Sequence, residues 1–343
     1  MSPAPLALSL GDPAGVGPEI VAKAWTALRA TGPTFMVIGD AELLRTAAPV
    51  RRVSGAADAV AAFAEAIPVL DVPLAAPVVS GQPSPDHAGA IVRWIETGVG
   101  LALSGQTSGL VTAPIAKAPL YEAGFKFPGH TEFLADLTSA HPYEGCRGPV
   151  MMLTAGDLRV ALVTIHEPIA KVPGLLTTDR IVTTGLCVAQ SLKRDFGIEL
   201  PRLAVAGLNP HAGESGALGR EEVEIIGPAV EALRAQGVDA TGPLPADTMF
   251  HAEARATYDA ALCMYHDQAL IPVKMLDFWG GVNVTLGLPI VRTSPDHGTG
   301  FAIAGRGLAR PDSLIAAIRL AAEIASRRAS FDTPRSRGAA QDD

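Results

Sequence analysis

The sequence lacks the features of a secreted or membrane-anchored protein. Its three cysteines, Cys146, Cys187 and Cys263, are widely spaced and form no CxxC pair, so a disulfide framework is not expected. The amino terminus MSPAPLALSL has no basic residue before its apolar run, and no apolar run reaches the roughly 18 residues that span a bilayer. We therefore expect a cytoplasmic protein whose thiols are reduced.

An excess of positive charge is also missing. Lys and Arg number 27 against 35 Asp and Glu, which gives a formal net charge of -8. The chain therefore has no general electrostatic footprint for nucleic acid or for an anionic membrane. An anionic substrate must instead be bound by a few basic residues gathered in one place, which favours an enzyme acting on a small molecule.

The hydrophobic pattern predicts an α/β protein. With 343 residues and 48% hydrophobic content, the chain can bury one large core or two moderate ones. Short Val- and Ile-rich runs alternate with Ala- and Leu-rich segments, as in α/β folds. The expected strands cover residues 6–10, 35–38, 109–112, 150–153, 160–165, 203–208, 260–265, 282–286 and 290–292, and the expected helices include 86–104, 178–196, 221–236 and 311–326.

The carboxyl-terminal segment is poor in large apolar residues. From residue 326 it reads SRRASFDTPRSRGAAQDD, a composition that does not favour packing against a core. We expect residues 326–343 to form a mobile tail with solvated basic side chains, dispensable for chemistry.

Three histidines each follow an apolar run. VALVTIH ends on His166, LAVAGLNPH on His211 and AALCMYH on His266. In open α/β sheets ligands gather beyond the carboxyl ends of strands, so three imidazoles from separate strands can meet there and bind a catalytic metal ion. Glu167 and Asp267 could orient an imidazole. The alternative is three unrelated histidines, bonded to backbone carbonyls or exposed in loops.

Basic and polar residues cluster after the third histidine. Lys274 lies in IPVKML, Asn283 in GVNVTLG and Arg292 in PIVRTSPDHGTG. Arg and Lys are the usual partners of carboxylate and phosphate groups. Their apolar, Gly-rich surroundings favour an anion site, and the alternative is that they are solvated surface residues.

The common nucleotide-binding fingerprints are absent. No GxGxxG follows a strand, and GDPAGVGPE at residues 11–19 lacks the ending of a Walker A loop. This segment is either a structural turn or a turn before a helix whose N–H groups face an anion.

Several segments together resemble the 4-hydroxythreonine-4-phosphate dehydrogenase family of pyridoxal phosphate biosynthesis. The resemblance extends from residue 8 to about residue 317. The segments are GDPAGVGPE (11–19), TAPIAK (112–117), GHTEFLAD (129–136), LNPHAGE (208–214), PADTMF (245–250), YDAALCMYHDQ (258–268) and TLGLPIVRTSPDHGT (285–299).

The resemblance implies a set of site residues. A divalent ion, zinc, cobalt or magnesium, would be held by His166, His211 and His266. The substrate would be bound by His130, Thr131, Lys274, Asn283 and Arg292. Family members are homodimers whose metal site takes ligands from both subunits, so a single chain would have an incomplete site.

The resemblance also implies a fold. The family is similar to isocitrate and isopropylmalate dehydrogenases, which have two α/β/α lobes and an active site in the cleft between them. Residues 1–130 with 290–325 would form the first lobe, and residues 131–289 the second. NAD, or NADP, would contact the loop of residues 294–309 through Ser294, His297, Gly298 and Gly305.

The implied reaction is an oxidation followed by decarboxylation. 4-Phosphohydroxy-L-threonine would give its hydride to NAD, and the resulting β-keto acid would lose carbon dioxide to leave 3-amino-2-oxopropyl phosphate. Asp247 and Asp267 are the candidates for proton removal, and Lys274 is assigned to catalysis as well as to substrate binding. The alternatives are a related dehydrogenase for 4-phosphothreonate, 4-phosphoerythronate or aromatic cis-dihydrodiols, a metal-dependent phosphate ester hydrolase, and a non-catalytic sugar-phosphate binding protein.

Overall fold

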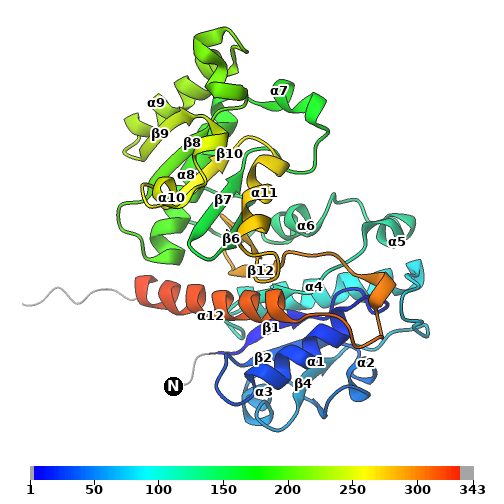
Figure 1. Ribbon diagram of the computed structural model, residues 1–343. Helices are drawn as coiled ribbons and strands as arrows, with labels where there is room; N and C mark the ends of the chain where they lie inside the picture. Colours follow the sequence, from blue (N-terminus) through cyan, green and yellow to red (C-terminus); the bar gives the residue numbers. More distant parts are fainter. Residues whose placement is uncertain (1–3, 333–343) are drawn as a thin grey trace, which may run out of the picture.

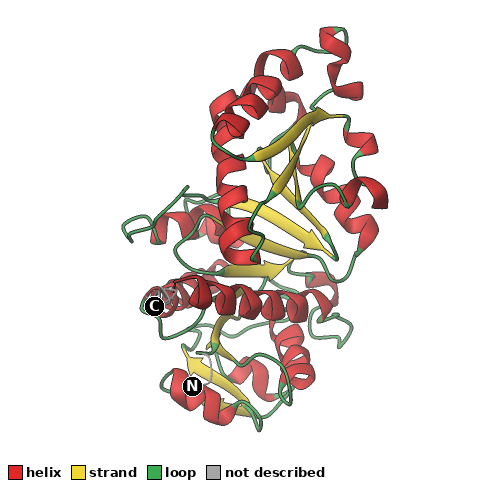
Figure 2. Ribbon diagram, turned by 90° about the vertical axis from the view of Figure 1, so that its left-hand side faces the viewer, coloured by secondary structure: helices red, strands yellow, loops and turns green. Residues whose placement is uncertain are grey.

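A single twelve-stranded sheet runs through the protein, with helices on both sides of it (Figures 1 and 2). The structure is a computed structural model and describes residues 4–332. The strands are β1 Leu6–Ser9, β2 Phe35–Gly39, β3 Val50–Arg52, β4 Ile67–Asp71, β5 Leu110–Thr112, β6 Val150–Ala155, β7 Leu158–Leu162, β8 Arg202–Ala206, β9 Asp239–Leu244, β10 Ala260–Cys263, β11 Val282–Leu286 and β12 Arg292–Pro295. The predicted α/β class is therefore confirmed.

The strand order is β3-β4-β2-β1-β5-β12-β11-β6-β7-β10-β8-β9. The strands from β3 to β12 are parallel to their neighbours, β11 and β6 are each antiparallel to both of theirs, and β7, β10, β8 and β9 are again parallel. The sheet thus changes direction at its middle. The predicted lobe boundary would fall there, between β12 and β11, and it remains a prediction.

Three strands were not predicted, because each lacks a continuous apolar run. β3 is short and largely exposed, β4 contains Pro68, and β9 includes Gly242 and Pro243. The last predicted strand, 290–292, is also wrong in its bounds, since β12 begins only at Arg292.

The helices are α1 Gly17–Leu28, α2 Glu42–Arg45, α3 Ala56–Ala62, α4 Ala88–Leu103, α5 Lys117–Glu122, α6 His130–Leu137, α7 Val172–Leu175, α8 Thr178–Phe196, α9 Gly227–Ala235, α10 Ala252–Arg255, α11 His266–Leu276 and α12 Asp312–Asp332. The bounds of α8 follow from its caps. Thr177 accepts a hydrogen bond from the backbone N–H of Arg180, and Gly197 ends the helix in a left-handed conformation. Between residues 4 and 332 we find no helix that is both long and apolar enough to cross a membrane.

The helix α12 continues beyond the predicted boundary at residue 326. Arg328 Nε lies 2.7 Å from the buried Oδ1 of Asp195, and Arg327 donates a hydrogen bond to the carbonyl of Phe196. These contacts attach the end of α12 to α8. Residues 326–332 are therefore helical rather than a mobile tail, and the remainder of the predicted tail, 333–343, lies outside the described residues.

Candidate active site

A cavity of about 340 Å³ lies against the middle strands of the sheet, where its direction changes. It is formed by residues of β5, β6, β11 and β12, by the start of α6 and by the segments that follow β7 and β10. Its lining includes Thr112, Lys117, His130, Thr131, Glu132, His166, His266, Asn283, Arg292, Ser294, Asp296, His297 and Gly298. Residues far apart in the sequence thus meet at one concave surface.

Arg292 is the most unusual charge in this cavity. Its side chain is buried, with the residue only 2% exposed, and it donates hydrogen bonds to the hydroxyls of Thr285 and Thr112 at 2.9 and 2.7 Å. Its Nε has no hydrogen-bond partner among residues 4–332. Burial lowers the pKa of Arg292 to about 10, although Glu132 opposes the shift. A buried guanidinium with a free donor is suited to bind an anion.

His130 and Asn283 resemble Arg292 in their unpaired polar atoms. Among the residues that the structure describes, neither His130 Nε2 nor Asn283 Oδ1 has a hydrogen-bond partner, although both atoms are buried. Burial, with Arg292 and Lys117 close by, holds the pKa of His130 well below its ordinary value. The imidazole is therefore neutral at pH 7. Buried polar atoms without partners are rare in folded proteins, and their gathering here indicates a polar ligand.

His166 and His266 lie side by side. Their ring centroids are 5.7 Å apart, because β7 and β10 are neighbouring parallel strands whose ends carry the two residues. His266 Nδ1 lies 2.7 Å from Asp267 Oδ1, which directs its Nε2 away from that carboxylate. Burial, with Lys117 and His266, lowers the pKa of His166. Two imidazoles, one neutral and one oriented by a carboxylate, fit a transition-metal ion.

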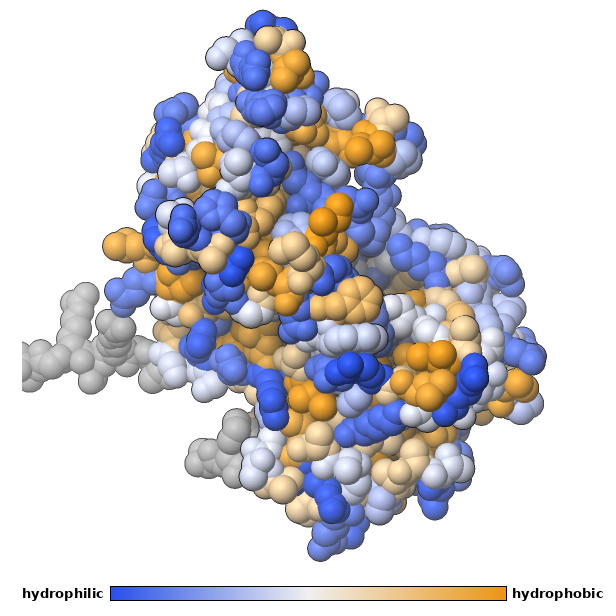
Figure 3. Space-filling model, in the orientation of Figure 1, coloured by the Kyte–Doolittle hydropathy of each residue, from blue (hydrophilic) through white to orange (hydrophobic). Residues whose placement is uncertain are grey.

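His211 does not join them. It lines a second cavity of about 680 Å³ together with Asp247 and Asp267. Over residues 4–332, no group of three or more His, Cys, Asp or Glu side chains is arranged to hold a metal ion. The three strand ends therefore do not bring their histidines to one point within a single chain. The exposed apolar side chains of α11 lie beside this cavity, on the face that Figure 3 shows.

The reason is the backbone after β8. The segment Pro210–Gly216 contains a left-handed helical turn in which residues 211–215 all have positive φ. Such a turn costs roughly 1–2 kcal/mol for each residue other than glycine. It carries His211, which lies in this turn, away from the line of the strand. No periodicity of apolar residues predicts such a turn.

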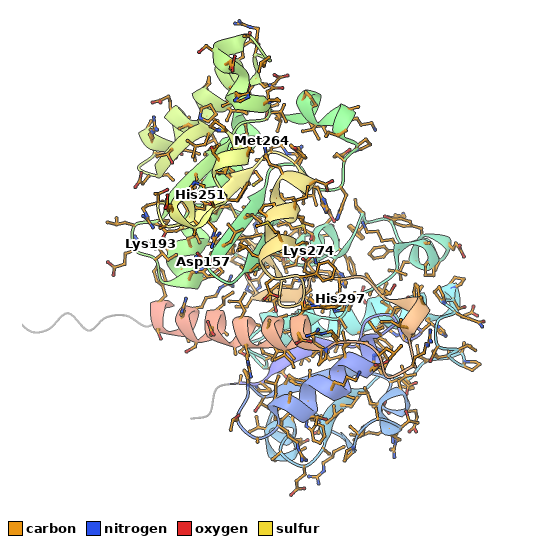
Figure 4. All side chains as sticks on the ribbon, in the orientation of Figure 1. Asp157, Lys193, His251, Met264, Lys274 and His297 are labelled. Carbon is orange, nitrogen blue, oxygen red and sulfur yellow. The ribbon has the colours of Figure 1, made fainter. Side chains whose placement is uncertain are left out.

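The predicted nucleotide residues are distributed between two spaces. Ser294, His297 and Gly298 line the first cavity, whereas Gly305 does not. A third cavity of about 370 Å³, with a mostly apolar lining, shares residues 296–298 with the first. Lys274 lines this third cavity, and its Nζ lies 2.6 Å from Asp296 Oδ2. Figure 4 shows Lys274 and His297 near the middle of the molecule.

Three charged residues of the first cavity, Lys117, Glu132 and Asp296, were not assigned from the sequence. Lys117 and Glu132 lie beside Gly129, since a Cβ there would be 3.7 Å from Lys117 Nζ and 3.5 Å from Glu132 Oε2. Both belong to segments that carried the family resemblance, TAPIAK and GHTE. Their place in those segments was the available signal, because Lys117 ends TAPIAK and Glu132 directly follows His130 and Thr131.

Comparison with known proteins identifies the family. The family described as "Pyridoxal phosphate biosynthetic protein PdxA" matches residues 32–321. The chain belongs to the PdxA family. The resemblance predicted from the sequence segments is thereby confirmed.

Relatives of this PdxA protein are similar over nearly their whole length. A 4-hydroxythreonine-4-phosphate dehydrogenase of Caulobacter vibrioides is 72% identical over 331 residues, covering 96% of this chain and 99% of the relative. One of Maricaulis maris is 57% identical, covering 95% and 98%. The crystal structure of a protein of that name from Klebsiella pneumoniae is 40% identical, covers 94% and 98%, and has a TM-score of 0.83.

A solved structure with another name is also similar to this PdxA protein. It is a terephthalate 1,2-cis-dihydrodiol dehydrogenase of Burkholderia xenovorans, 30% identical, with a TM-score of 0.62 and coverage of 93% and 98%. The fold is therefore shared by proteins named for two different substrates, and the choice between those substrates depends on the side chains of the site.

Proposed function

We propose that this chain is a nicotinamide-dependent dehydrogenase that oxidises 4-phosphohydroxy-L-threonine in pyridoxal phosphate biosynthesis, with decarboxylation to 3-amino-2-oxopropyl phosphate. The observation that carries the proposal is the set of unpaired buried polar atoms of Arg292, His130 and Asn283 in the cavity that holds His166 and His266. A phosphorylated hydroxy acid would supply both the anions and the hydrogen-bonding groups that these atoms lack.

The cationic and the neutral groups of the cavity would bind different parts of the substrate. The buried guanidinium of Arg292 and the amine of Lys117 would bind the anionic groups of the substrate. Neutral His130, with Thr131 and Asn283, would bind polar groups without adding charge. Fixing the substrate at both ends holds its secondary alcohol in one orientation, which is a large part of what such a site contributes to the rate.

His166 and His266 would provide two ligands of a divalent metal ion. Imidazole ligands suit zinc or cobalt better than magnesium. When bound, such an ion lowers the pKa of a coordinated alcohol and stabilises developing negative charge on oxygen. The third ligand, His211, would come from a second subunit of a homodimer, because it lies in a different cavity of its own chain. Asp267 holds the ring of His266 in place for this role.

The nucleotide would lie along the loop after β12. Ser294, His297 and Gly298 line the first cavity and would bring the nicotinamide to the substrate, where it accepts the hydride. The adjoining third cavity would take another part of NAD or NADP. Lys274 pairs with Asp296 at the junction of the two cavities. It would hold the loop in place and attract the anionic groups of the ligands.

Proton removal would fall to the second cavity's carboxylates, Asp247 and Asp267, which accompany His211. If a second subunit supplies His211, its Asp247 arrives at the same time, because both residues line the same surface. A carboxylate at that position can accept the proton of the substrate alcohol.

Product analysis tests the proposal. Purified protein would be incubated with Co²⁺, NAD and 4-phosphohydroxy-L-threonine, while NADH, carbon dioxide and inorganic phosphate are measured. NADH and carbon dioxide in equal amounts are expected. Release of phosphate without NADH would instead identify a hydrolase. Parallel reactions with 4-phosphothreonate, 4-phosphoerythronate and an aromatic cis-dihydrodiol separate the related dehydrogenases, and faster turnover of any of these would overturn the substrate assignment.

A further inference from the structure

The backbone that carries His211 is strained. Residues 211–215 have φ between 43° and 76°, and only Gly213 among them is a glycine. L-residues with side chains avoid consecutive left-handed conformations, so such a turn persists only where the surrounding structure holds it. The question is which group holds this turn, because the same group determines where the His211 ring points.

The buried carboxylate of Glu222 is that group. The residue is 4% exposed, and its Oε1 accepts hydrogen bonds from the backbone N–H groups of Leu208 and Asn209 at 2.8 and 2.7 Å. Its Oε2 accepts a third from the side-chain amide of Asn209 at 3.0 Å, and the same amide also donates to the less buried Glu221 Oε2 at 2.7 Å. Glu222 thus fixes both residues that lead from β8 into the turn. It also begins the π-helical segment Glu222–Ile226, an irregularity often found at functional sites.

The glycines around the turn leave room for this carboxylate. A Cβ at Gly213 would lie 2.5 Å from Glu222 Oε2, and a Cβ at Gly219 would lie 2.2 Å from the amide nitrogen of Asn209. Neither distance is compatible with a side chain. The turn therefore packs closely against the carboxylate and the amide, and these two glycines have no room for a side chain.

His211 itself has no other support. Its ring is exposed, and among residues 4–332 no group forms a hydrogen bond with it, in contrast to the ring of His266, which Asp267 orients. No hydrogen bond orients the His211 imidazole, so the backbone of the turn sets the position from which its side chain projects.

We propose that Glu222 is a positioning residue for His211. Its carboxylate holds the strained turn so that the imidazole projects outward, to complete the metal site of a second subunit. This inference rests on the proposed shared site. It adds that loss of Glu222 in one chain damages the metal site of the partner chain, which uses the His211 of the altered chain. The site that contains the altered chain's own His166 and His266 stays intact.

Defined heterodimers separate these two effects. Glu222→Ala chains would be paired with His166→Ala chains or with His211→Ala chains, and the tagged heterodimers purified. In the pairing with His166→Ala, the site on the Glu222→Ala chain keeps its own His166 and His266. It receives an undamaged His211 from the other chain. Activity should then equal that of the reference heterodimer, His166→Ala with His211→Ala. With His211→Ala, one site lacks His211 and the other receives a damaged one, so activity should fall to about half that of the Glu222→Ala homodimer. Equal activity of the two pairings would overturn the proposal.

Binding of Co²⁺, followed by its visible absorption, gives a readout independent of turnover. The Glu222→Ala homodimer should bind Co²⁺ about 10- to 100-fold more weakly, the usual effect of removing a group that orients a ligand. Glu222→Gln, which keeps an acceptor for the backbone N–H groups, should recover part of the affinity. The matched control is Glu224→Ala, an exposed carboxylate of the same segment, which should bind Co²⁺ like the wild type.

The two proposals fail in different ways. If the reference heterodimer is inactive although its subunits are paired, the shared site is wrong. The Co²⁺ affinities then decide the role of Glu222: weakening in both Glu222→Ala and His211→Ala supports it, and wild-type affinity in Glu222→Ala overturns it. An equal loss in Glu222→Ala and Glu224→Ala would also overturn it, because a general disturbance of the segment would then explain the effect.

Discussion

Arg292 should contribute much to ligand binding and almost nothing to the stability of the free protein. The substitution that tests this is Arg292→Met, which keeps most of the side-chain volume and removes the charge and all donors. Within the described part of the chain, Arg292 is buried with no ion pair to a carboxylate, and its Nε is unpaired. A residue placed there for stability alone would be expected to have all its donors paired.

The magnitudes follow from the surroundings of the guanidinium. Lowering of the Arg292 pKa to about 10 by burial corresponds to a cost of roughly 3 kcal/mol for keeping the charge in the folded protein. The two hydrogen bonds to Thr112 and Thr285 return about 1.5 kcal/mol each, at the lower end of the range for charged groups. The two effects nearly cancel. Arg292→Met should therefore change the free energy of unfolding by no more than about 1 kcal/mol.

Binding should respond very differently. Two charged hydrogen bonds to an anionic ligand are worth about 3–6 kcal/mol, so kcat/KM should fall at least about a hundredfold. In wild-type protein, phosphate at a hundred times its Kd should add about 2.7 kcal/mol of stability. The variant should show no such stabilisation.

Urea denaturation with and without phosphate, together with steady-state kinetics, measures both quantities. Asp195→Ala is the matched control in the denaturation experiment, since it removes one partner of a buried ion pair and should cost about 3–5 kcal/mol. A loss of more than 3 kcal/mol in Arg292→Met without phosphate would show that the residue is structural. Phosphate stabilisation equal to that of the wild type would refute its role in anion binding.

Three further predictions concern other residues. Because the pKa of His130 is lowered, the unfolded chain binds a proton before the folded protein does, so stability is full above about pH 6.5 and falls below it by up to about 1.4 kcal/mol per pH unit. Thermal unfolding from pH 7.5 to 5 should show a shallower fall in His130→Gln, and parallel curves would contradict this. Lys117→Met should lower kcat/KM about ten- to a hundredfold in steady-state kinetics, whereas Lys193→Met on α8 should not. Truncation after residue 325 should lower the urea midpoint below that of a chain truncated after residue 332, because it removes Arg328 from Asp195; equal midpoints would refute that role of α12.

Much of the fold was predictable because most strands coincide with continuous apolar runs, namely β1, β2, β5, β6, β7, β8, β10 and β11. The pairing of His166 with His266 also follows from sequence, once β7 and β10 are recognised as parallel strands that end at the same edge. The short strands β3 and β4 and the Pro-containing β9 were not predictable in this way. Their pairing depends on neighbours in the sheet rather than on their own composition.

The end of α12 illustrates a second limit. Composition predicted a mobile segment from residue 326, because the segment has few apolar residues. Arg328 is nevertheless held by Asp195, a buried carboxylate 133 positions earlier in the chain. A long-range ion pair leaves no trace in local composition, so only the tertiary structure reveals it.

The position of His211 illustrates a limit of a different kind. The strand pattern correctly places this residue after β8, but the turn between strand and ligand is held by Glu222, thirteen residues beyond Asn209. Each chain consequently has a cavity that holds two of the three predicted metal ligands, His166 and His266, beside unpaired polar atoms, and a separate surface that carries the exposed third, His211. Ile271 and Met275, 67% and 75% exposed, lie on that surface beside His211. Apolar side chains so exposed favour burial against another protein surface. A second copy of the chain would cover them and deliver His211 in the same step, which supports the proposal that assembly and completion of the metal site are one event.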